Sequence, residues 1–486
     1  MGIRCKKMKK LARNSIIYTV GTVVIAVVSL LSTMILTRVL SEQTYAQYGL
    51  LTTFITASVT VISLGMDTAY TRFFYESGYT PLKYLVKSCR IPFFILLIYV
   101  ICLIEPHHFI LKYIIGDNVD LQFALLVVGY LAFALFGKFT QLTARMGEFA
   151  INYISSNLVS KAGFVLVILL LSLIIPDVNI KWVALSFLIA FTFAVVINIS
   201  TLYRVKNVQV EERPKITTKE MLSYGVPVMI NNVMILIIPL FERIIVRDVA
   251  GWTVLSIYQS ASVFYTVVAM MKTTIDNIWN PIVFKHYENK NFFKQILHDF
   301  GLAVTAVTTV GLGACILLRR WLVLILDSSY YSSYLIAPAI VFAACFEIYS
   351  LIYSVGLNIS KKTVHMVVSP AIQMLISFAL CYLLIPSMGL IGVGIASLAG
   401  VVFSKLYRII FGLHYYSTEK KEIKVVLLWI IGGIASIITM FSVSFISDLV
   451  IFLILCALTA LIINREGIDM IKRIGSMLMS KEKKQD

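Results

Sequence analysis

Between residues 15 and 464 the sequence repeats one pattern: about 20 apolar residues, a short polar break, and another apolar run. An α-helix needs a stretch of about that length to cross the hydrocarbon core of a bilayer. We identify fourteen such stretches, which predict an all-α polytopic membrane protein with 14 transmembrane helices. The predicted spans are 15–37, 46–66, 91–114, 121–143, 157–175, 182–202, 222–246, 254–280, 297–318, 334–356, 363–385, 390–412, 424–444 and 447–464.

The composition is 59% hydrophobic and only 14% charged, which excludes an ordinary soluble protein. The net charge of +17 has a simpler explanation than nucleic-acid binding. If the N-terminus is cytoplasmic, 33 of the 42 Lys and Arg residues fall on the cytoplasmic side, seven fall on the opposite side, and Lys138 and Lys272 lie inside spans. Such an excess marks the cytoplasmic loops of membrane proteins. It predicts two cytoplasmic termini, contact with anionic membrane lipids, and no nucleic-acid partner.

Several functional classes are excluded by missing motifs. The first apolar run is too long for a cleavable signal peptide and lacks a small-residue cleavage site. The seven cysteines include no CxxC pair, and the six histidines form no HExxH motif. No GxxxxGK[ST] loop is present. We therefore expect no metal site, no cofactor and no ATP hydrolysis within this chain.

The two halves of the chain resemble each other. In the first half, two successive helices end with Leu173–Pro176 and Leu202–Arg204. In the second half, two successive helices end with the similar segments Leu383–Pro386 and Leu406–Arg408. Any two apolar helices look somewhat alike, but similar end segments at matched positions favour a true repeat. Six helices separate the paired elements, so the halves are predicted to be parallel six-helix repeats around a central cleft, with two further C-terminal helices.

The repeat sets the predicted domain boundaries. They are a cytoplasmic N-terminus (1–14), an N-lobe with spans 1–6 (15–204), a cytoplasmic linker (205–221), a C-lobe with spans 7–12 (222–412), spans 13 and 14 (413–464) and a cytoplasmic tail (465–486).

Several motifs are spread along nearly the whole chain. Leu64–Glu76, preceded by Tyr48–Leu50, resembles the signature of the second helix in the polysaccharide-transporter family. One departure is Glu242, where the family usually has Asp. The other matching segments are Tyr224–Pro227 and Phe241–Ile245 in the seventh helix, Ser256–Ala261 and Ile278–Pro281 in the eighth, and Lys361–Thr363 and Ile385–Gly392 around the eleventh and twelfth.

This family contains the flippases of lipid-linked O-antigen and capsule repeat units, in a superfamily shared with multidrug and toxin extrusion pumps and lipid II flippases. The resemblance implies an alternating-access flippase that moves an oligosaccharide on undecaprenyl diphosphate from the inner to the outer leaflet. It implies a multi-pass protein of the bacterial cytoplasmic (inner) membrane, working in lipopolysaccharide, capsule or exopolysaccharide biosynthesis. A polysaccharide polymerase and chain-length machinery are the partners it suggests. The glycan and the coupling ion stay open.

Charges inside the spans are the candidate cargo contacts, since a charge at membrane depth needs a partner or a water-filled cavity. Lys138 lies deep in span 4 with no acidic residue nearby in the sequence, and predicts contact with an anionic ligand; the alternative is a structural bond to a distant carbonyl. Asp67 and Arg72 lie at the inner end of span 2, where they predict either an interfacial ion pair or a role in cargo access.

Two further groups lie in the second half. Lys272 and Asp276 are four residues apart on one face of span 8, which favours a structural pair that could also line the cleft. Glu242 and Arg243 lie in the outer part of span 7. The candidate substrate-binding residues are thus Arg72, Lys138, Arg243 and Lys272, with Asp67, Glu242 and Asp276 as charge partners.

Three other functions compete with the flippase. A multidrug-efflux pump would favour acidic residues in its cleft, whereas the charges inside these spans lean cationic. A lipid II-type flippase would differ only in the headgroup it carries. A membrane-embedded polymerase or ligase would need a long outer loop with catalytic residues, but the longest outer loop, near Arg319–Ser333, has a single acid, Asp327. We therefore expect that the chain is not an enzyme.

The predicted topology can be tested with a reporter that is active only in the cytoplasm. Fusions after Val205, after Ser360 or at the C-terminus should give signal, because these sites follow an even number of spans. Fusions after Gln43 or Pro386 should be silent. A signal after Pro386 would contradict the fourteen-span topology.

Overall fold

The computed structural model describes residues 2–105, 108–116, 119–205, 215–360, 362, 364–416 and 423–463. Throughout those residues the regular elements are helices and no strand is present, which confirms the predicted all-α fold. The predicted tail 465–486, most of the linker 205–221, and Lys361 and Thr363 lie outside the described residues.

Clustering of contacts divides the chain into two compact units, Met1–Ile244 and Ile245–Asp486. The first unit contains α1 (Gly2–Val39), α2 (Glu42–Ser63), α3 (Met66–Phe73), α4 (Pro81–Ile104), α5 (Phe109–Ile115), α6 (Leu121–Met146), α7 (Ala150–Ile174), α8 (Ile180–Val205) and α9 (Thr218–His286) as far as Ile244. The second contains the rest of α9, then α10 (Lys290–Val323), η1 (Ser328–Leu335), α11 (Ala337–Tyr353), α12 (Val355–Ile359), α13 (Val364–Met388), α14 (Leu390–Tyr415), α15 (Ile423–Phe441) and α16 (Phe445–Ile463).

The predicted spans all overlap helices. Eleven helices of the described chain are long and apolar enough to cross a membrane, or twelve if η1 and α11, which bend by 54°, count as one span. Two predicted spans fall on the single helix α9, whose two arms meet at Gly251, a residue with φ +83°. The chain is therefore a multi-pass membrane protein; a count of fourteen is compatible with these helices and stays a prediction.

The first unit is held together by a buried aromatic stack. The rings of Phe164 on α7 and Phe187 on α8 lie 3.9 Å apart and nearly parallel, and Tyr130 on α6 stacks on Phe187 at 4.6 Å. Tyr48 on α2 stacks on both phenylalanines. Offset or stacked rings stabilise a core beyond the area they bury. The stack therefore joins four helices of this unit.

A contact between two glycines fixes the start of α9 in the same unit. Gly65, which joins α2 to α3 with φ +73°, lies against Gly225 on α9. A Cβ on Gly65 would lie 2.0 Å from the Gly225 carbonyl oxygen, and one on Gly225 would lie 2.4 Å from that of Gly65. Only glycine allows backbones to approach so closely. Two segments that carry the family resemblance thus meet in the structure.

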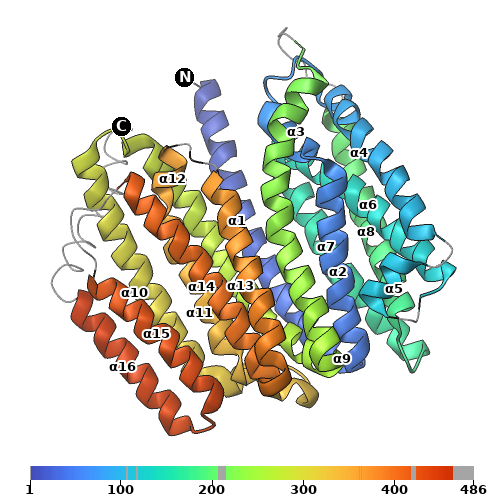
Figure 1. The fold of residues 1–486 in the computed structure, drawn as a ribbon. Coiled ribbons are helices and arrows are strands. Elements are labelled where there is room, and N and C mark those ends of the chain that lie inside the picture. Colours follow the sequence, from blue (N-terminus) through green and yellow to red (C-terminus); the bar gives the residue numbers. More distant parts are fainter. Residues whose placement is uncertain are drawn as a thin grey trace. The chain divides into compact units, whose positions relative to one another are not determined.

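The second unit includes the two C-terminal helices. α13 and α14 pack along each other, and α15 and α16 pack on α10 and α11 (Figure 1). Arg319 on α10 is fully buried and donates to both carboxylate oxygens of Asp448 on α16, at 2.9 and 3.0 Å. It also donates to the carbonyl oxygens of Thr439 and Ser442. This buried ion pair docks the α15–α16 hairpin onto α10.

We expect Arg319→Ala or Asp448→Ala to destabilise the protein by about 3–5 kcal/mol, because each leaves a buried charge without its partner. An Arg319→Met/Asp448→Leu double variant should recover much of that loss. Thermal unfolding in detergent measures both. Arg320→Ala is the control, because Arg320 is partly exposed and lies 3.8 Å from Asp448. Equal melting temperatures for wild type and Arg319→Ala would contradict the docking role.

Candidate functional site

Lys138 on α6 has an acidic partner. Its Nζ lies 2.7 Å from Oδ2 of Asp67, the second residue of α3. Leu64 and Gly65 have positive φ angles, and they end α2 and turn the chain into α3, which carries Asp67. The sequence shows no acidic residue near Lys138, because the partner lies on another helix. Contact of Lys138 with an anionic ligand stays a prediction.

Arg72 does not pair with Asp67, as one interpretation of the sequence suggested. Its Nη1 lies 3.0 Å from Oε1 of Glu76, one turn later, and both side chains are about half exposed (48% and 52%). An exposed i, i+4 pair contributes little to stability. A role for Arg72 in contacting cargo stays a prediction.

Arg243 ties the first arm of α9 to α2. Its Nη1 donates to the carbonyl oxygen of Gly49 at 2.6 Å and to the hydroxyl of Thr53. Glu242 beside it is only 5% exposed. These contacts give Arg243 a structural role within the first unit, and its role in binding cargo stays a prediction.

Lys272 is paired with an acid that the sequence analysis did not single out. Its Nζ lies 2.7 Å from Oε2 of Glu347, a buried residue well inside α11. Lys405 on α14 approaches the other oxygen, Oε1, at 3.0 Å. The hydroxyl of Tyr265, two turns before Lys272 on α9, donates to Oε2 at 3.0 Å. The sequence analysis paired Lys272 with Asp276 and did not consider Glu347, whose carboxylate contacts Lys272 in the structure.

Arg408 completes this group, which we call the Glu347 cluster: Tyr265, Lys272, Glu347, Lys405 and Arg408. Arg408 follows Lys405 by three residues on α14, on the same side of the helix. It lies within electrostatic range of Glu347 and Lys405. Its buried Nε has no hydrogen-bond partner among the described residues. Three cations thus surround a single carboxylate.

A sequence signal for this cluster existed. Glu347 lies near the middle of the predicted span 334–356, and Lys405 and Arg408 lie inside 390–412. The two cations were assigned to a cytoplasmic flank because they lie close to the end of the apolar run. Treating every charge within a predicted span alike would have found all three.

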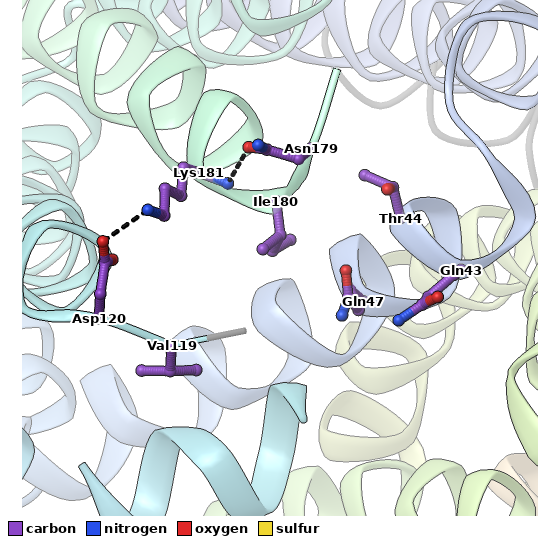
Figure 2. A pocket seen from close by; sticks show the side chains of 8 residues that line it. All are labelled: Gln43, Thr44, Gln47, Val119, Asp120, Asn179, Ile180 and Lys181. Carbon is purple, nitrogen blue, oxygen red and sulfur yellow. Dashed lines mark hydrogen bonds and ion pairs between the residues drawn. The ribbon is translucent and has the colours of Figure 1, made fainter. Parts of the chain in front are cut away.

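A cavity of about 470 Å³ lies at another place in the first unit, where α2, α6 and α8 begin (Figure 2). On one side Lys181 Nζ donates to Asp120 Oδ2 at 2.5 Å, and the side chains of Gln43, Thr44 and Gln47 lie across from this pair. The hydrogen bond from Lys181 lowers the pKa of Asp120. Such a volume is within the range of small-molecule sites. None of the predicted site residues is among those that line it.

The family described as polysaccharide biosynthesis protein matches residues 11–287, which is more than half of the chain. The chain belongs to this family. None of the curated proteins compared with the chain matches it.

Solved structures share the fold at low sequence identity. A lipid II flippase MurJ in an inward closed conformation aligns with a TM-score of 0.67 and 14% identity, covering 93% of this chain and 100% of that one. An inward-facing multidrug resistance MATE family transporter of the MOP superfamily aligns with a TM-score of 0.64 and 11% identity, covering 81% and 94%. The fold is that of these transporters and flippases, and the family is one of polysaccharide biosynthesis. The prediction of a transporter rather than an enzyme agrees with both.

The loss of stability caused by substitutions in the Glu347 cluster should depend on which charge is removed. Glu347→Gln leaves two lysines together without a carboxylate, so we expect the largest loss of melting temperature and protein level. Lys272→Met or Lys405→Met leaves Glu347 with one partner and should have a smaller effect. The control is Glu76→Gln, which breaks only an exposed pair worth about 0–1 kcal/mol. A Glu347→Gln protein as stable as this control would contradict the central position of Glu347.

Proposed function

We propose that this chain flips an oligosaccharide repeat unit on undecaprenyl diphosphate across the membrane, for a surface polysaccharide such as O-antigen, capsule or exopolysaccharide. The observation that carries the proposal is the positive charge of the Glu347 cluster. The family and the fold support a flippase-type transporter, and the cluster supports an anionic cargo.

The excess of positive charge in the Glu347 cluster favours an anionic cargo. Glu347 neutralises one of the three cations, since Lys272 and Lys405 share its two oxygens. The remaining charge includes Arg408, whose Nε makes no hydrogen bond among the described residues. A guanidinium recognises phosphate through several N–H donors in one plane. A diphosphate is therefore a ligand that supplies both the missing charge and the missing acceptors.

The same balance disfavours a cationic drug as cargo. A drug pump would attract cations with an exposed carboxylate, whereas Glu347 is buried and held by two lysines and a tyrosine hydroxyl. The apolar exterior of a multi-pass protein suits a polyprenyl tail that stays in lipid during transfer. We place the protein in the bacterial cytoplasmic membrane with both termini inside, beside the polymerase and chain-length proteins that use the delivered repeat unit.

Reconstituted vesicles test this function directly. Purified protein should move an undecaprenyl-diphosphate oligosaccharide between leaflets, measured as the fraction accessible to an added glycosidase. Arg408→Gln should slow transfer about tenfold or more, the equivalent of one charge-assisted hydrogen bond, with unchanged protein level. Arg247→Gln is the control in the same unit, because Arg247 pairs with its neighbour Asp248.

Two other cargoes make the test specific. Lipid II in the same vesicles should move more slowly than the oligosaccharide repeat unit, and a cationic drug should not be transported. Transport of the drug without transfer of either lipid would overturn the proposal. Faster transfer of lipid II than of any repeat unit would reassign the cargo to lipid II.

A further inference from the structure

A second lysine within a helix of the first unit, Lys161, forms no ion pair with a carboxylate among the described residues. The predicted span 157–175 places it only four residues from the start of that span. In the structure α7 already starts at Ala150 and continues to Ile174. With a rise of about 1.5 Å per residue, Lys161 lies about 16 Å from the start of the helix. That is well inside the span.

Lys161 is itself exposed, but the face of α7 that carries it becomes buried further along the helix. Residues three, four and seven positions further on share its face of the helix. Those residues, Phe164, Val165 and Ile168, are all buried. Four strongly exposed apolar residues of α7 lie on the other side of the helix, namely Leu166, Leu170, Leu173 and Ile174. The lysine therefore does not extend from the apolar stripe that suits lipid.

The partner of Lys161 is a hydroxyl and not a carboxylate. Its Nζ donates to Oγ of Ser29 on α1 at 2.7 Å. That hydroxyl uses its own hydrogen on the carbonyl oxygen of Ile25, at 2.8 Å, so it presents a lone pair to the lysine. Within the part of the chain that the structure describes, no acidic side chain pairs with Lys161. Two of the three ammonium hydrogens are left for another acceptor.

This environment differs from that of Lys138, Lys272 and Lys405. Lys138 has Asp67 at 2.7 Å, and Lys272 and Lys405 share Glu347. A membrane-depth lysine without a carboxylate needs an anion from outside the protein, because an isolated charge in a low-dielectric site is costly. The side chain is also exposed, so a ligand has access to it.

We propose that Lys161 and Ser29 form an anion subsite between α7 and α1 that binds a phosphate of the polyprenyl diphosphate cargo. This inference rests on the proposed function and adds to it a phosphate-binding position that lies within the first unit. The ammonium supplies the charge, and Ser29 orients it. The ligand class is a phosphate ester carried on a lipid, with the prenyl diphosphate as its source.

Thermal unfolding of the full-length protein in detergent tests the subsite. The probes are farnesyl diphosphate, the neutral alcohol farnesol, and phosphatidylglycerol. Farnesyl diphosphate should raise the melting temperature of the wild type in a saturable way, since a ligand of the native state stabilises it, and farnesol should not. Lys161→Met should weaken the apparent affinity about tenfold or more, and Ser29→Ala less. Lys161→Arg should retain most of the affinity.

The controls separate binding from folding. Without ligand, Lys161→Met should melt no lower than wild type, because it removes a charge that has no protein counter-charge. Lys181→Met, whose lysine pairs with Asp120 at the start of α8, should bind farnesyl diphosphate like wild type.

Three outcomes would overturn the inference. If wild type and Lys161→Met respond equally to farnesyl diphosphate, the subsite is wrong while the proposed function stands. If wild type does not respond at all, both are wrong. If Lys161 affects only the response to phosphatidylglycerol, the subsite binds a bilayer lipid and not the cargo.

Discussion

The need to match every charge inside a membrane governs this structure. Hydrocarbon offers no water to an ionised side chain, so a lysine or arginine within a span has to meet an anion, another polar group of the protein or a water-filled cavity. Each such match joins helices that are distant in the sequence. Asp67 and Lys138 join α3 to α6, and Arg319 and Asp448 join α10 to α16. The matched pairs therefore belong to the architecture.

We propose a role in binding cargo for the positively charged residues that the protein's own acidic residues do not fully neutralise. Arg319 is satisfied by four oxygen contacts, two from Asp448 and two from backbone carbonyls, and leaves no room for a ligand. The Glu347 cluster has more cations than carboxylates, and Lys161 has a hydroxyl alone. A transporter must release what it binds, so a site that is only partly neutralised by the protein suits a cargo that completes the charge balance for a limited time.

The sequence predicted the helices well and their pairing poorly, for one physical reason. The length of an apolar run is a local property, so the spans could be located before any contact was known. Ion pairs depend on which helices pack together, and no property of Lys138 alone points to Asp67. The start of α7 shows how a small error in a boundary matters: moving it from 157 to Ala150 places Lys161 eleven residues from the start of the helix instead of four. Glu347, by contrast, was visible as an acid in the middle of an apolar run.

The buried pair of Arg319 and Asp448 also bears on how the chain is made. The two residues are 129 positions apart, and the arginine is synthesised first. Until α16 has been inserted, the translating ribosome and the insertion machinery hold a chain whose α10 carries an arginine without its carboxylate. α16 thus completes the charge pairing of α10, and a chain that stops before α16 presents quality-control proteases with an unpaired arginine in the membrane.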